Sequence, residues 1–154
     1  AVPALARLTP LLPMVKRLGF ARQRMFRETE PYGLQDERLR AQIARAMEGP
    51  DSSVAGLPGN PWHSLAELFQ LSRVVRRQLP QVTQPCLIAH AVRDDIASLR
   101  NARLVERRVR GPTQMLLLEH SYHMITIDRE RRLLARRSAE FFASIEPTSA
   151  QVAP

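Results

Sequence analysis

The chain has 154 residues, of which 44% are hydrophobic and 25% are charged. These values are those of one globular domain with a sizeable core, and they exclude an intrinsically disordered chain. The net charge of +8 comes almost entirely from arginine. Because the arginines lie opposite apolar helix stripes, with no aromatic residues between them, we interpret them as solvated helix faces and expect no nucleic-acid partner.

The single cysteine, Cys86, excludes an internal disulfide and is consistent with a reducing compartment, so we predict a cytoplasmic location. Prolines and arginines interrupt the apolar N-terminal run, and no apolar span is long enough to cross a bilayer. The sequence also lacks the pattern of a signal peptide. We therefore expect no stable membrane insertion.

Residues 1–20 carry leucines that could line one side of two short helical pieces, because Pro10 and Pro13 break a single straight helix. This segment is either a packed helical pair or a lid over an apolar substrate. An amphipathic helix is predicted for residues 34–47, with Asp36 in its first turn, where an acid complements the helix dipole.

Turn and breaker residues gather in residues 48–61, the clearest interruption of the chain. We place a boundary there, between a helical cap or lid region (residues 1–61) and a core segment (residues 62–146). Residues 147–154 are rich in Ser, Thr, Ala and Pro, and we predict a disordered tail. At the start of the core segment, Ser64 is a suitable N-cap for a helix.

Two strands are predicted next, at residues 85–92 and 113–118, because each contains a short continuous apolar run, at residues 86–89 and 115–118, without polar alternation. Such runs are typical of strands buried on both faces of a parallel sheet. A helix predicted for residues 98–109, with Ser98 as its N-cap, separates them, so the three elements form a βαβ unit with a right-handed crossover. A last helix follows, which we expect Asp128 to cap.

An acid and a histidine follow the carboxyl ends of these two strands: Asp94 comes shortly after the first strand, and His123 after the second. In open parallel sheets, functional groups gather just beyond these ends. In a nucleophile–histidine–acid site, the acid accepts from one imidazole nitrogen and leaves the other free to take the nucleophile's proton. The sequence therefore predicts that Asp94 and His123 lie together as such a pair.

The other reactive side chains are given structural roles. Cys86 lies in the middle of a strand, which favours a small core residue over a nucleophile. His63 and His90 have no acid partner that the sequence suggests. Histidines and carboxylates show no standard metal-ligand spacing, so we expect no metal and no cofactor.

Two segments of the core resemble one enzyme family. LIAHAVRDD, residues 87–95, looks like the acid turn of the carboxylesterase and monoacylglycerol-lipase branch of the α/β-hydrolases. SYHMITID, residues 121–128, is similar to the histidine turn of that branch. The resemblance covers residues 30–142. Tyr122 stands where that branch often has glycine, a difference that we expect to reshape the pocket wall without removing the histidine.

The resemblance implies an α/β fold, namely the C-terminal portion of an α/β-hydrolase fold: parallel strands with crossover helices, preceded by the helical cap. Its register assigns the triad acid to Asp94 and not to Asp95, which we expect to cap a helix or to form a salt bridge. It assigns the base to His123 and not to His120.

The nucleophile of such a triad is not found. No Gly-x-Ser-x-Gly elbow occurs in the sequence, and no serine lies in a strand–turn–helix context. We therefore expect a fragment of a serine hydrolase that carries the acid and the histidine without the serine, whose partner is the missing N-terminal half of the same fold. Alone, the chain is expected to be inactive, and the first strand to have an open apolar edge.

The resemblance and the apolar cap region together favour cleavage of carboxylic esters of apolar acyl groups through an acyl-serine intermediate. Peptidases, thioesterases and acyltransferases of the same fold share these C-terminal turns and remain alternatives. A different class of function is a non-catalytic basic α/β module that binds an anionic partner or surface.

Overall fold

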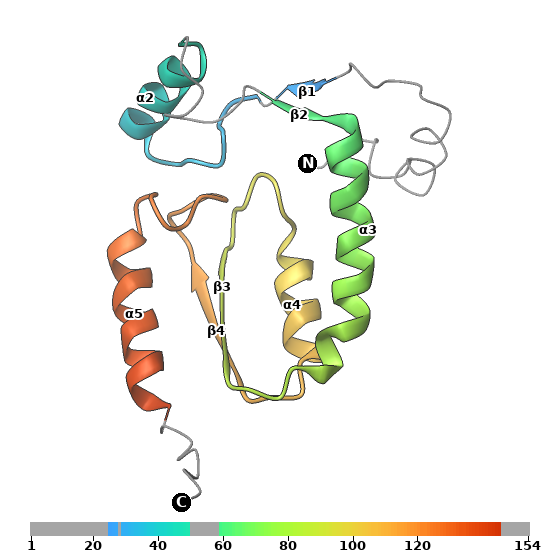
Figure 1. Ribbon diagram of the computed structural model, residues 1–154. Coiled ribbons are helices and arrows are strands. Elements are labelled where there is room, and N and C mark those ends of the chain that lie inside the picture. Colours follow the sequence, from blue (N-terminus) through green and yellow to red (C-terminus); the bar gives the residue numbers. More distant parts are fainter. Residues whose placement is uncertain (1–24, 28, 50–58, 146–154) are drawn as a thin grey trace, which may run out of the picture.

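The computed structural model describes residues 25–27, 29–49 and 59–145 (Figure 1). In chain order its elements are β1 (Met25–Arg27), α2 (Glu37–Met47), β2 (Gly59–Pro61), α3 (Trp62–Gln78), the 3-10 helix η2 (Leu79–Gln81), β3 (Cys86–Ala91), α4 (Leu99–Arg108), β4 (Thr113–Leu118) and α5 (Arg131–Ser144). Much of the expected cap region and the whole expected tail lie outside the described residues.

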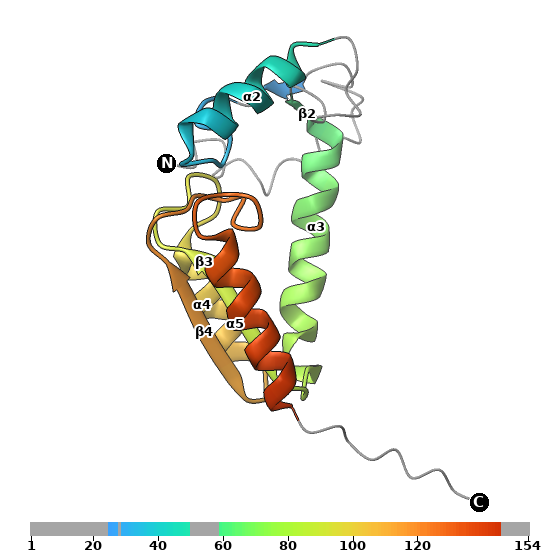
Figure 2. The ribbon, with the colours of Figure 1, turned by 90° about the vertical axis from the view of Figure 1, so that its left-hand side faces the viewer.

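The core of the described chain is a βαβ unit made of β3, α4 and β4. The two strands are adjacent and parallel, and their register runs from Cys86 opposite Thr113 to Ala91 opposite Leu118. α4 and α5 both contact β3, from opposite sides of the strand pair (Figures 1 and 2). The predicted strands, the helix between them and their parallel pairing are therefore confirmed.

The strands are apolar on both faces because helices cover both faces. Ala91 and Leu118 are completely buried where the two strands end. The other residues of β3 are only half-buried, although the sequence predicted full burial. The reason is the small size of the sheet: within the described residues β4 alone pairs with β3, and the other edge of β3 has no strand partner.

α2 begins at Glu37, later than the predicted residue 34. Asp36 is its N-cap, and the Oδ1 atom of Asp36 accepts from the N–H groups of Arg38 and Leu39. Leu34, just before the helix, is completely buried. Residues 34–36 are not helical: Asp36 has the extended backbone of an N-cap, and the backbone N–H groups of residues 35 and 36 are bound by a carboxylate described below.

α3 begins at Trp62, so the prediction that Ser64 caps this helix is wrong. Its N-cap is Pro61, which has extended backbone and belongs to β2, and no side chain caps the helix. The chain passes directly from β2 into α3, and Ser64 lies exposed inside the first turn. No described helix combines the length and the apolar character that a membrane span requires.

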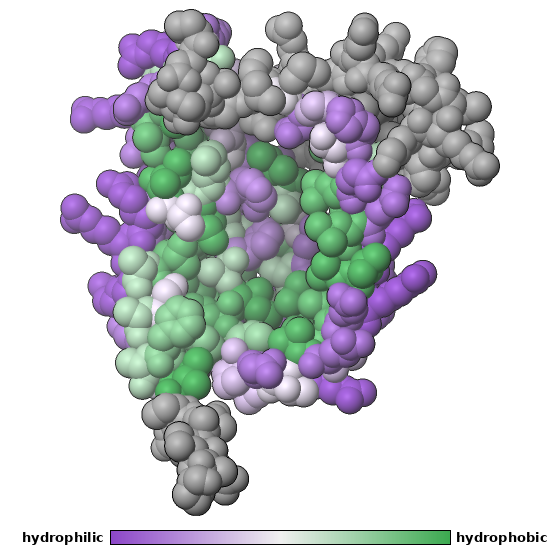
Figure 3. All heavy atoms as spheres, in the orientation of Figure 1, coloured by the Kyte–Doolittle hydropathy of each residue, from purple (hydrophilic) through white to green (hydrophobic). Residues whose placement is uncertain are grey.

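Apolar side chains are unusually exposed along α3 and at the end of α5. Figure 3 shows apolar residues gathered over both helices on the side of the molecule seen in Figure 1. The most exposed are Leu68 (54%), Leu71 (58%), Val74 (48%) and Phe142 (70%). A surface of this kind marks a site of interaction with another polypeptide or with a ligand.

Candidate active site

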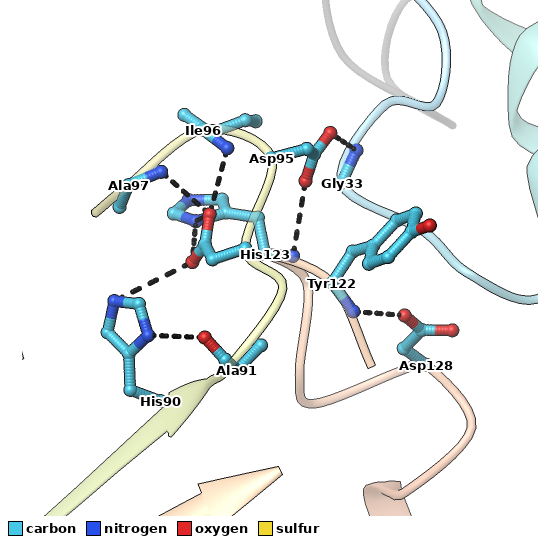
Figure 4. Close-up of polar contacts among 10 residues, drawn as sticks. Gly33, His90, Ala91, Asp95, Ile96, Ala97, Tyr122, His123 and Asp128 are labelled. Atoms are coloured by element: carbon cyan, nitrogen blue, oxygen red, sulfur yellow. Dashed lines mark hydrogen bonds and ion pairs between the residues drawn. The ribbon is translucent and has the colours of Figure 1, made fainter. Parts of the chain in front are cut away.

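Asp94 lies in the loop that follows β3, and its carboxylate is held by the backbone of the same loop. Its Oδ1 atom accepts from the N–H of Ile96 at 2.9 Å and from the N–H of Ala97 at 2.6 Å (Figure 4). Asp is favoured in such turns because its short side chain can bind the backbone two and three residues onward. The Asp94 side chain is only 5% exposed. Its orientation is therefore fixed before any partner is considered.

His123 lies in the loop that follows β4, and its ring meets the Asp94 carboxylate. The His123 Nδ1 atom is 2.9 Å from Oδ2 and 3.2 Å from Oδ1 of Asp94. Since an ionised carboxylate only accepts, Nδ1 carries the proton. In the neutral ring the other nitrogen, Nε2, then keeps its lone pair, on a side chain that is 43% exposed. The structure thus brings together the two residues that the sequence analysis paired.

The environment of Asp94 favours its charged form. Burial raises the pKa of this carboxyl, but the hydrogen bonds from the Ala97 N–H, the His123 ring and the Ile96 N–H together lower it more. The net result is a pKa below the ordinary value of an aspartate. Asp94 is consequently an anion at neutral pH, which is the state needed to orient an imidazole and to stabilise an imidazolium.

His90 is a second histidine beside the same acid, and the prediction that it lacks an acid partner is wrong. Its Nε2 atom is 3.8 Å from Oδ2 of Asp94, and its Nδ1 atom is 2.7 Å from the carbonyl oxygen of Ala91 (Figure 4). The turn after β3 folds Asp94 back toward the side chain that precedes it by four residues. A prediction that the chain turns back directly after β3 would have identified this contact.

Within the described residues the rival acid, Asp95, neither caps a helix nor forms a salt bridge, contrary to expectation. Its Oδ2 accepts from the backbone N–H of Gly33 at 3.0 Å, and its Oδ1 from the N–H of His123 at 3.4 Å. The rival base, His120, is exposed after β4, and its N–H donates to Glu130. Among the described residues, hydrogen bonds or ion pairs reach the Asp94 carboxylate from the rings of His123 and His90 but from no other histidine.

Asp128 does not cap the last helix, so that prediction is also wrong. The N-cap of α5 is Glu130, without a side-chain capping bond. Glu130 instead accepts from the N–H of His120 and from the hydroxyl of Ser121, and the Ser121 hydroxyl accepts in turn from the N–H of Glu130. Ser121 is completely buried in this exchange, which gives it a structural role.

The carboxylate of Asp128 is completely buried, and within the described residues its hydrogen bonds all come from backbone N–H groups. Burial raises the pKa of this carboxyl, but four backbone hydrogen bonds together lower it by more. The net pKa therefore lies below the ordinary value of an aspartate. The N–H donors belong to Gln35 (2.8 Å), Asp36 (2.9 Å), Tyr122 (2.7 Å) and Arg129 (2.9 Å). Sequence reasoning missed this role because two donors are more than ninety residues away. In the described part of the chain, no cluster of His, Cys, Asp and Glu is arranged to hold a metal ion.

Comparison with known proteins relates this arrangement to lipolytic enzymes. No family model matches the chain. Over 102 residues, 66% of the chain, the sequence is 26% identical to the thermostable monoacylglycerol lipase of Bacillus sp. (strain H-257), of which the match covers 41%.

Solved structures give the same relation. A structure from a study of two metagenome-derived lipolytic enzymes, LipS and LipT, superposes with a TM-score of 0.57 at 27% identity, over 58% of this chain and 37% of the other. The monoacylglycerol lipase of Paleococcus ferrophilus superposes with a TM-score of 0.69 over 90% of this chain and 52% of the other, at 14% identity, which bears on the fold alone.

The chain spans about half or less of the length of each of these relatives. Its parallel strand pair with helices on both sides is accordingly part of an α/β-hydrolase fold, as the sequence predicted. From the loops after β3 and β4 and from these relatives together, it follows that the chain is related to the lipases and esterases of the α/β-hydrolase fold.

Proposed function

We propose that this chain is the C-terminal part of a serine hydrolase that cleaves carboxylic esters of apolar acyl groups, with Asp94 and His123 as the acid and the histidine of its triad. One observation carries the proposal: His123 Nδ1 is 2.9 Å from Asp94 Oδ2, in loops that follow two adjacent parallel strands. This is the geometry by which an acid orients a general base.

The roles of the two residues follow from their protonation states. Asp94 accepts from Nδ1–H of His123 and thereby fixes the tautomer in which Nε2 is the free base. Nε2 takes the proton of the serine hydroxyl as the serine attacks the ester carbonyl, and the imidazolium is stabilised by the Asp94 anion. The proton then passes to the leaving alcohol. The acyl-serine is hydrolysed by water in the same manner, with His123 again as base.

The serine belongs to an N-terminal half of the same fold that pairs with this chain. Two observations support this partner: within the described residues β3 has one unpaired edge, and α3 exposes Leu68, Leu71 and Val74. A further strand on β3 and a covering layer on α3 would bury both surfaces. On this proposal residues 1–61 are the cap, residues 62–146 the core segment, and the isolated chain has no turnover.

The substrate class is inferred from the relatives and from composition. Two relatives are monoacylglycerol lipases by name and a third is lipolytic, and the N-terminal region of this chain is rich in leucine. An apolar acyl group fits such surroundings better than a sugar or a charged peptide. We therefore place ester cleavage ahead of the peptidase, thioesterase and acyltransferase reactions of the same fold.

The test is ester hydrolysis by the intact protein that contains this chain, with p-nitrophenyl esters of short and long fatty acids as substrates. We expect His123→Ala and Asp94→Asn each to lower kcat by about 10⁴-fold, since each removes one member of the triad. The matched control is His120→Ala, which removes a nearby histidine that does not bind Asp94, and its activity should stay near that of the unmodified protein. Equal effects of His120→Ala and His123→Ala, or activity that survives both triad substitutions, would contradict the proposal.

A further inference from the structure

The buried carboxylate of Asp128 takes no part in the proposed reaction, yet it joins two distant segments. Two of its four N–H donors, from Gln35 and Asp36, immediately precede α2. The other two, from Tyr122 and Arg129, lie on either side of the loop that carries His123. One carboxylate therefore fastens the start of α2 to the histidine loop.

Asp95 makes a second bridge between the same segments. It accepts from the N–H of Gly33 and from the N–H of His123 (Figure 4). A backbone bond lies beside it, in which the N–H of Met124 donates to the carbonyl oxygen of Gly33 at 2.8 Å. Adjacent acids thus hold one histidine at two points, Asp94 at the ring and Asp95 at the backbone.

Gly33 also lies close to His123. Its φ is +71°, and a Cβ atom added there would lie 3.0 Å from Cβ of His123 and 3.1 Å from Cγ of Met124. Gly33 thus lies close to His123, and a side chain on residue 33 would push against the histidine. His123 is held at its ring by Asp94 and has Gly33 close to its Cβ atom.

We propose that Asp95 and Asp128 are positioning residues for His123, which they hold in place by fastening its loop to residues 33–36. The inference rests on the proposed function, because it assigns these residues to the same catalytic histidine. It also makes the segment just before α2 part of the support of the site, so that a displacement of residues 33–36 moves His123 relative to Asp94. Neither carboxylate needs to touch the substrate.

The test compares Asp95→Asn and Asp128→Asn in the intact protein. Asn is isosteric with Asp, but its amide nitrogen cannot accept, so each substitution leaves at least one backbone N–H facing another donor. We expect kcat to fall by about 10- to 100-fold with KM nearly unchanged, since a displaced base weakens the transition state without weakening substrate binding. The downfield proton resonance of His123 Nδ1–H should shift or broaden in both variants.

Glu140→Gln is the matched control. It makes the same change of charge on α5, where Glu140 pairs with the exposed Arg136 and Arg137. We expect its kcat and its His123 resonance to equal those of the unmodified protein. Thermal unfolding of every variant separates loss of fold from loss of position. If Asp128→Asn does not fold, Asp95→Asn and Gly33→Ala carry the test, because Asp95 and Gly33 lie in loops close to His123.

The outcomes separate this inference from the proposed function. Folded Asp95→Asn and Gly33→Ala variants with unchanged kcat and an unchanged His123 resonance would overturn the positioning role, even in an active enzyme. An unmodified protein that hydrolyses no ester and reacts with no serine-directed phosphonate would overturn the proposed function instead. In that case the His123 resonance alone still decides whether Asp95 and Asp128 position the ring.

Discussion

Ala91 and Leu118 lie opposite each other at the carboxyl ends of β3 and β4, and both are completely buried. The N–H of Val92 donates to the carbonyl oxygen of Leu118 at 2.8 Å, so the two strands end together. The loops that begin there are therefore held side by side, and the Asp94 carboxylate meets the His123 ring. Strand register, more than any local feature of the loops, brings these residues together.

Folding stability should fall in acid because of Asp94 and Asp128. Both have a pKa below the ordinary value in the folded chain, so the unfolded chain binds protons more readily. Their contribution is fully present above about pH 4 and is lost as the pH falls through the lower folded-state pKa. Urea unfolding at a series of pH values measures this loss. In Asp128→Asn the free energy of unfolding should depend less on pH below about pH 4. An unchanged pH dependence would contradict a lowered pKa of Asp128 in the folded chain.

Gly111→Ala should strongly destabilise the fold. A Cβ atom at this position would overlap the carbonyl oxygens of Thr83 and Gln84, which are backbone atoms that cannot move aside. The N–H of Gly111 also donates to the carbonyl oxygen of Val82, so the turn before β4 is held tightly. The control is Gly49→Ala, whose nearest contact would be 3.2 Å. Thermal unfolding should show a much larger loss for Gly111→Ala, and equal losses would contradict this packing.

Leu71→Ala tests whether α3 is covered in the intact protein. Leu71 is 58% exposed, so in the isolated chain the substitution should change the free energy of unfolding by less than about 0.5 kcal/mol. If a missing half covers α3, the same substitution in the intact protein should cost about 2–5 kcal/mol. Leu118→Ala is the control, because Leu118 is buried already and should be costly in both. A small cost of Leu71→Ala in the intact protein would argue against a covered α3.

The parts of the fold that the sequence predicted are those set by local pattern. β3, α4 and β4 were placed correctly because each strand is one continuous apolar run bounded by turn residues, and Ser98 caps the helix between them. Asp94 and His123 could be paired because they follow the ends of such strands, and the family resemblance selected them over Asp95 and His120. No knowledge of a distant segment was needed for this prediction.

Two of the failures, at Asp128 and Asp95, have one physical cause, namely that distant partners replaced local ones. Asp128 looks like an N-cap from its neighbours, but it is buried against residues 35 and 36, whose N–H groups no local pattern assigns to it. Asp95 is likewise bound to Gly33. Ser64 does not cap α3 for a local reason, because Pro61 carries the chain from a strand directly into the helix. A carboxylate that binds backbone far along the chain leaves no periodic signal in the sequence.

His90 should matter for activity, but much less than His123. Its Nε2 atom is 3.8 Å from Oδ2 of Asp94, beyond hydrogen-bonding distance, and Asp94 is held independently by the N–H groups of Ile96 and Ala97. We expect His90→Ala to lower kcat by less than about 10-fold, against about 10⁴-fold for His123→Ala. Steady-state kinetics on one ester measures both. A larger fall in kcat for His90→Ala than for His123→Ala would mean that His90, and not His123, is the base.

The proposed function requires that His123, oriented by Asp94, activates a serine. The most direct measurement is to treat the intact protein with an alkyl fluorophosphonate and to locate the adduct by mass spectrometry, with His123→Ala and His120→Ala in parallel. We expect an adduct on one serine outside these 154 residues, lost in His123→Ala and kept in His120→Ala. An intact protein that forms no adduct, or an adduct that forms equally without His123, would contradict it.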